Sequence, residues 1–243
     1  MLDHHTTTMK QIQRIVLISI APLLLLTGCW WPEKFTATLD INSDRTFTFR
    51  YEGILAYAPA VAELKKSGKL QAGVENDLKQ AQKELMKEEG FKSCSYKGDG
   101  RFQIVYEKSG KVDRRVDLLG ENLRILSLTP TAEGIEILGM SLKASDRQQL
   151  AAIGLSLDGT VQVVSGLKVT EHNAQRSPSL GGLVGCYGWH LTMNDASPPK
   201  LVLSNVSGSK PIMTGSTLWL LVSVAAVLIG IVYARRKRTP TAT

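Results

Sequence analysis

The chain's reactive side chains are three cysteines and, late in the sequence, two histidines. Cys29 directly follows Leu26-Thr27-Gly28 at the end of an uncharged apolar run. Small residues before a single cysteine let a signal peptidase approach the backbone, and the thiol of that cysteine is the nucleophile that receives a diacylglyceryl group. The pattern predicts lipidation of Cys29 and a lipoprotein signal peptide over residues 1–28.

The composition of residues 1–28 fits this interpretation. Lys10 and Arg14 form a positive region, and residues 15–26 form an apolar segment of twelve residues. A membrane-spanning helix needs about 20 apolar residues, so this segment is short for a span. An uncleaved anchor with an incidental cysteine is the alternative. Met9 is an alternative start, because residues 9–29 alone make a complete signal.

Two cysteines remain for the exported part of the chain, where disulfides persist. A bond between Cys94 and Cys186 would close a loop of about 90 residues and stabilise the fold by roughly 4–5 kcal/mol. The sequence therefore predicts this disulfide, with two buried free thiols as the alternative. Two cysteines so far apart make no zinc motif.

The candidates for catalysis are few. Cys186, His190 and Asp195 can be drawn as a nucleophile set, but on a strand His190 faces away from Trp189 and towards solvent. His172 has no partner of this kind nearby. No glycine-rich loop has the context of a phosphate site, and no spacing of acidic residues and histidines suggests a metal. We expect no enzyme activity, no cofactor and no metal site.

Residues 180–189 form an uncharged, glycine-rich apolar stretch between polar segments. If exposed, this stretch would mark a contact with lipid or protein. If buried, it is a core strand. Its larger side chains are the predicted ligand-contact residues, namely Leu183, Val184, Tyr187 and Trp189.

Residues 212–234 carry no charge over 23 positions, about 34 Å as a helix, which is enough to cross a bilayer. Four basic residues follow at 235–238, so residues 235–243 are predicted to be cytoplasmic and residues 29–211 extracytoplasmic. A helical span indicates the cell membrane, which is the inner membrane in a Gram-negative cell. Small residues at four-residue spacing allow oligomerisation through Ala226, Gly230 and Ala234.

The net charge of +7 comes mostly from the two ends of the chain. Between residues 29 and 234 the sequence has 23 basic and 21 acidic residues. This balance gives no basic surface for nucleic acid. The basic residues at the two ends are therefore interpreted as signals that set the membrane topology.

The exported segment predicts an α+β, β-rich domain of antiparallel strands with an inserted helical hairpin. Apolar and polar residues alternate over 35–41 and 47–55 around a polar turn, which predicts a β-hairpin. Helices are expected over 60–67 and 71–89, the second with an apolar stripe. Further strands are expected at 102–106, 112–118, 123–128, 135–142, 152–157, 160–164, 167–171, 188–193 and 201–206.

The second helix has two interpretations. Its lysines and glutamates face away from the apolar stripe. A basic amphipathic helix can lie on anionic lipid. An ordinary helix can instead pack on a sheet with a solvated charged face, and the interleaved acidic residues favour this alternative.

The order of these features resembles the LppM-type membrane-anchored lipoproteins. The resemblance covers most of the mature chain and includes the lipidation motif, the polar turn at 40–44, the helical insertion, Asn173-Ala174, Trp189 and the C-terminal span. The chain departs from that family at Asp44-Arg45, where Asp-Gly is usual. The resemblance implies a compact domain on the membrane surface that binds lipid or glycolipid without catalysis.

These observations together predict an envelope lipoprotein that binds membrane lipid or glycolipid at the bilayer surface. The alternative is a docking or assembly factor for other envelope proteins.

Overall fold

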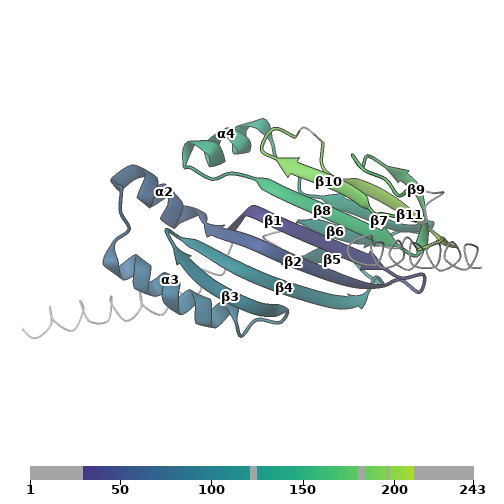
Figure 1. The fold of residues 1–243 in the computed structure, drawn as a ribbon, viewed down its shortest axis with the longest axis horizontal. Coiled ribbons are helices and arrows are strands. Elements are labelled where there is room, and N and C mark those ends of the chain that lie inside the picture. Colours follow the sequence, from purple (N-terminus) through teal and green to yellow (C-terminus); the bar gives the residue numbers. More distant parts are fainter. Residues whose placement is uncertain (1–29, 121–124, 180–183, 196, 211–243) are drawn as a thin grey trace, which may run out of the picture.

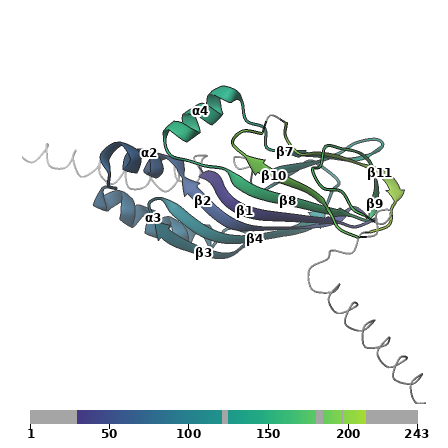
Figure 2. The same cartoon turned by 45° about the horizontal axis from the view of Figure 1, so that its top comes forward.

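A computed structural model of the chain describes residues 30–120, 125–179, 184–195 and 197–210. They form two β-sheets and three helices, which confirms the predicted α+β, β-rich class. The sheets stack face to face, and the helices gather at one end of the stack (Figures 1 and 2).

The first sheet, sheet A, has six strands in the order β10-β8-β1-β2-β4-β3. Its strands are β1 (Trp30–Ile41), β2 (Thr46–Tyr57), β3 (Phe91–Gly98), β4 (Arg101–Lys111), β8 (Asp158–Ser165) and β10 (Tyr187–Thr192). Within β1, Phe35, Ala37, Leu39 and Ile41 are at most 6% exposed, while the residues between them are polar. This alternation places one face of sheet A in the core and the other towards solvent.

The second sheet, sheet B, has five strands in the order β5-β6-β7-β11-β9. They are β5 (Val116–Leu118), β6 (Leu126–Pro130), β7 (Gly134–Gly139), β9 (Leu167–His172) and β11 (Lys200–Ser207). Leucine and isoleucine side chains from its inner face join those of sheet A in one continuous core.

The predicted hairpin between β1 and β2 is confirmed. Arg45 adopts φ 68°, the left-handed conformation that glycine favours, so this turn has the backbone shape of an Asp-Gly turn without the glycine. The Arg45 guanidinium donates to the side chain of Asn205 and to the carbonyl of Gly134. The hairpin turn is thereby fastened to sheet B.

The predicted helical hairpin is formed by α2 (Ala58–Ser67) and α3 (Ala72–Leu85). Helix α3 lies beside β3 (Figure 1), and its buried residues are Leu78, Ala81 and Leu85. Helix α3 therefore packs on a sheet through its apolar stripe, and its charged face remains in solvent. This is the second of the two arrangements that the sequence allowed.

Glutamine side chains cover both edges of sheet A. The Oε1 atom of Gln82 accepts the backbone N–H of Tyr96 in edge strand β3, at 2.9 Å. At the other edge, the amide of Gln175 accepts the N–H of His190 and donates to its carbonyl. Each glutamine occupies hydrogen-bonding positions that a further strand would need.

Two predictions about the strands are wrong. Residues 144–152 form a helix, α4 (Ala144–Ala152), and residues 153–157 connect it to β8, so the strand expected at 152–157 does not form. Strand β8 also pairs parallel with β1, although the other pairings of the described strands are antiparallel. A buried parallel strand and an antiparallel one share the same two-residue period, so the pattern could not separate them.

No helix in the described part of the chain is long and apolar enough to cross a membrane. The predicted span over 212–234, with Ala226, Gly230 and Ala234, lies outside the described residues, as do Cys29 and Leu183.

Candidate functional site

The predicted disulfide is not formed, and both Cys94 and Cys186 are free. Cys94 lies in β3 at one edge of sheet A, and Cys186 directly precedes β10 at the other edge. Four strands separate these edges, a distance of about 24 Å at the usual strand spacing. A disulfide requires Cα atoms within about 7 Å, so the sheet order forbids the bond.

Burial raises the pKa of the Cys94 thiol to about 11, which leaves roughly one thiolate per thousand molecules at pH 8. Burial also raises the pKa of Cys186, against a smaller opposing effect of Arg176. We predict that unfolding without reductant, followed by alkylation with iodoacetamide, labels both residues. In the native protein Cys186 should react before the more deeply buried Cys94. Peptide mass spectrometry that found residues 94 and 186 joined would contradict the sheet order.

The structure does not assemble the catalytic set that the sequence suggested, namely Cys186, His190 and Asp195. The His190 imidazole lies on the solvent side of β10, with Nε2 3.7 Å from the carboxylate of Asp158. The Asp195 carboxylate accepts the backbone N–H of Thr192 instead. Among the described residues no group of three or more potential ligands is placed to hold a metal ion.

The predicted ligand-contact stretch divides into buried and half-buried parts. Trp189 is 5% exposed, and its role as a ligand contact stays a prediction. Val184 and Tyr187 are half-buried, and the Tyr187 ring lies 4.9 Å from that of His172. Of residues 180–189, the structure describes 184–189; the last three begin strand β10, and only Gly188 and Trp189 are buried.

Asn173 joins the two sheets at this point. Its Oδ1 atom accepts the indole N–H of Trp189 at 2.9 Å and the backbone N–H of Lys200 at 2.8 Å. Its amide nitrogen donates to the carbonyl of Pro198 at 2.8 Å. These bonds give Asn173 and Trp189 a structural role where the two sheets meet.

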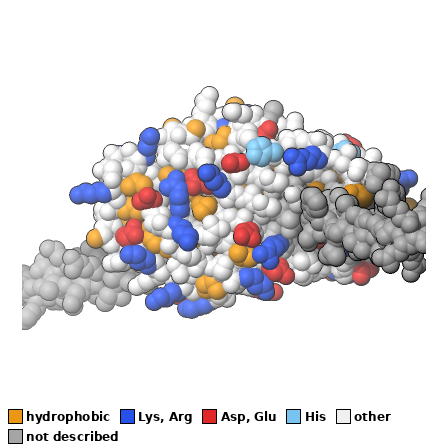
Figure 3. Space-filling view, in the orientation of Figure 1, with side chains coloured by type: hydrophobic (Ala, Val, Ile, Leu, Met, Phe, Trp, Pro, Cys, Tyr) orange, Lys and Arg blue, Asp and Glu red, His pale blue; other side chains and the backbone are white. Residues whose placement is uncertain are grey.

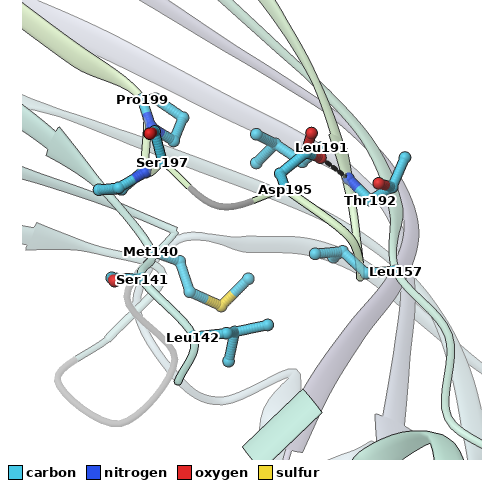
Figure 4. Close-up of a pocket in the computed structure, with 10 residues that line it drawn as sticks. Met140, Ser141, Leu142, Leu157, Leu191, Thr192, Asp195, Ser197 and Pro199 are labelled. Atoms are coloured by element: carbon cyan, nitrogen blue, oxygen red, sulfur yellow. Dashed lines mark hydrogen bonds between the residues drawn. The ribbon is translucent and has the colours of Figure 1, made fainter. Parts of the chain in front are cut away.

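A small pocket opens at the end of the sandwich that carries α4. Its apolar wall includes Met140, Leu142, Leu157 and Leu191, and Asp195 lies at its polar side (Figure 4). The cavity measures about 20 Å³, which is room for about one water molecule. It cannot hold an acyl chain in this conformation, so a buried lipid tail has no place in this pocket.

The outer face of sheet A is broad and polar. We call it the polar face, and it comprises Thr36, Thr38, Thr48, Arg50, Glu52, Ser95, Gln103, Glu107, Thr160, Gln162 and His190. Strand register sets them in rows, such as Gln162, Thr38 and Arg50 across three strands. Figure 3 shows side chains of both charges scattered over this face, with uncharged surface between them.

Charges on the polar face are compensated locally. Arg50 pairs with Glu52 at 3.3 Å and lies opposite Glu107 in β4. His190 lies near Asp158. The face therefore combines hydroxyl and amide groups with charges of both signs, including Lys34, Asp40, Lys97 and Asp158, which suits hydrogen bonding to a polar group without net charge.

The first described residues are held tightly at the helical end. The Glu33 carboxylate accepts two hydrogen bonds from the Arg101 guanidinium, at 2.6 and 3.0 Å. The pair spans the intervening strand β2 above Ala56, which is fully buried. The Glu33 hydrogen bond raises the pKa of Arg101, and burial together with the Glu33 charge raises that of Tyr51.

Aromatic residues continue this packing to the first residue of β1. The Trp30 ring contacts the rings of Tyr57 and Phe102, at centroid distances of 5.5 and 5.1 Å. Trp31 is 7% exposed and donates its indole N–H to the carbonyl of Ser156. The packed structure therefore includes Trp30, the residue that directly follows Cys29.

The last described residue is held at the opposite end. The Lys210 ammonium donates to Asn42 in the hairpin turn at 2.8 Å and pairs with Asp40 at 2.6 Å. Asp40 alternates with the buried residues of β1, so Lys210 lies on the side of the polar face. Both ends of the described chain are thus attached along β1.

Comparison with protein-family models gives no match for this chain, and comparison with curated proteins gives none either.

Proposed function

We propose that this protein is a membrane-tethered envelope lipoprotein without enzyme activity, and that its domain binds lipid or glycolipid headgroups. The tethers are the lipidated Cys29 and the span over residues 212–234. The ligand is the polar part of a lipid, and the polar face of sheet A is its binding surface. This proposal places the protein in the bacterial cell membrane with the domain outside the cytoplasm.

One observation carries the proposal: the outer face of sheet A presents many hydroxyl and amide groups and lies between the first and the last described residues of the chain. The filled core and the pocket of about 20 Å³ favour surface recognition over enclosure of a lipid tail. Locally compensated charges favour a neutral headgroup, such as a sugar, over a phosphate recognised by a basic cluster.

The test removes hydrogen-bonding groups without changing side-chain shape. Thr36→Val together with Thr38→Val replaces two hydroxyls on the polar face, and valine suits a strand. Two lost hydrogen bonds of about 1 kcal/mol each predict roughly thirtyfold weaker binding. The measurement is a titration of the full-length protein, in phosphatidylcholine nanodiscs, with a short-chain diglucosyl glycolipid.

Thr129→Val together with Thr170→Val is the matched control, because these threonines lie on the outer face of sheet B. The control should bind as the wild type does. Equal affinity of the wild type and both double variants would exclude the polar face as the binding surface. A stoichiometric protein partner recovered by crosslinking, with no glycolipid binding, would favour the docking or assembly function instead.

A further inference from the structure

Strand β1 separates the two tethers of the proposed function. It begins at Trp30, next to Cys29, and its far end is bound by Lys210 through Asp40 and Asn42. Twelve residues of extended strand measure about 35 Å. The two attachment points therefore lie at opposite ends of the long axis of sheet A.

At each end of the domain, at most one residue separates the described chain from the predicted membrane anchor. Trp30 packs into the aromatic cluster directly after the lipidated residue. Between Lys210 and the predicted span at 212 there is one residue, and two residues reach at most about 7 Å. A domain standing on either end would hold the other attachment about 35 Å above the membrane, beyond the reach of the chain.

The side on which the domain rests follows from where the chain leaves it. Strand β1 is an inner strand of sheet A, with β8 and β2 as its neighbours. Lys210 reaches Asp40 on the outer side of this strand. Strand β1, which joins the two attachments, thus runs along the middle of the polar face, and sheet B packs against its other side.

We propose that the domain lies lengthwise on its own membrane, with the polar face against the lipid headgroups and the outer face of sheet B towards the aqueous phase. The inference rests on the two tethers of the proposed function. The partner of this surface is the headgroup layer of the bilayer that holds the anchors. The neutral hydrogen-bonding side chains of the polar face suit that layer, because they need not enter the hydrocarbon.

Two glutamates provide a matched pair of probe positions. Glu52 lies in the polar face, and Glu136 lies on the outer face of sheet B. Each is replaced in turn by the photo-crosslinking residue benzoyl-phenylalanine in the full-length protein, reconstituted in phosphatidylcholine nanodiscs. Mass spectrometry then measures lipid adducts after irradiation. We expect adducts at residue 52, at least tenfold above those at residue 136.

A second pair guards against a local folding defect. Ser95 lies on the outer side of β3, and Thr170 lies on the exposed side of β9 in sheet B. Lys69, between α2 and α3, reports a domain that stands on its helical end. Adducts at 136 and 170, adducts at 69 alone, or equal labelling of both faces would overturn the proposed orientation.

Failure of the orientation and failure of headgroup recognition give different results. Phosphatidylcholine nanodiscs report orientation alone, because they contain no glycolipid. Adducts at 52 and 95 with unchanged glycolipid affinity in the Thr36→Val, Thr38→Val variant would keep the orientation and reject the recognition. Weaker glycolipid binding in that variant, with adducts at 136, would keep the recognition and reject the orientation.

Discussion

Replacing Arg101 with methionine should lower the free energy of unfolding by about 3–5 kcal/mol, because it leaves a buried carboxylate without its partner. The Glu33 side chain is 8% exposed and that of Arg101 is 29% exposed. Methionine keeps the length of the aliphatic stem, so the loss reports the charge and its two hydrogen bonds. Urea denaturation followed by circular dichroism gives the free energy.

The control is Arg50→Met, which removes the partner of Glu52 on the polar face. Both side chains of that pair are more than half exposed. Exposed pairs contribute about 0–1 kcal/mol, so this variant should unfold within 1 kcal/mol of the wild type. Equal losses for the two variants would show that Glu33 is hydrated in the native protein.

Gly134→Ala should destabilise the protein by more than about 4 kcal/mol or prevent folding, because the added methyl group has no space. A Cβ atom at this position would lie 1.8 Å from the carbonyl oxygen of Leu203 in β11. The obstacle is backbone of the paired strand, which cannot move without separating β7 from β11. The thermal unfolding midpoint of the purified variant measures the effect.

Gly73→Ala is the control for this substitution. Gly73 lies in the first turn of α3, and no atom lies within 4 Å of the added Cβ. Alanine in a helix is favoured over glycine by about 0.5–1 kcal/mol, so this variant should be slightly more stable than the wild type. A Gly134→Ala protein as stable as Gly73→Ala would mean that β7 and β11 do not pair as described.

Local patterns predicted the parts of the fold that depend on neighbours in sequence. The alternation around residues 42–45 gave the β1–β2 hairpin, and the stripe through Leu78 and Leu85 gave the buried face of α3. Both depend on periods of two or about 3.6 residues, which a single sequence displays directly.

The features that the sequence could not show depend on contacts between residues far apart in the chain. Cys94 and Cys186 suited a disulfide by compartment and loop length, but the order of the strands puts them at opposite edges. Trp189 suited an exposed contact because glycines surround it, yet its side chain is buried and its indole N–H bonds to the Asn173 side chain, 16 positions away. The pair of Glu33 and Arg101 joins residues 68 positions apart, with no local pattern at either one.

Under the membrane tethering that we propose, the glutamine side chains at both margins of sheet A have a consequence. Confinement to two dimensions multiplies encounters between identical molecules, as tethering does for any pair. Unpaired edge strands that meet side by side would form hydrogen bonds with each other and extend into ribbons. Gln82 and Gln175 occupy backbone groups of Tyr96 and His190, so a neighbouring copy cannot pair with sheet A at these two positions. For the membrane-tethered protein that we propose, these two positions oppose edge-to-edge pairing of neighbouring copies.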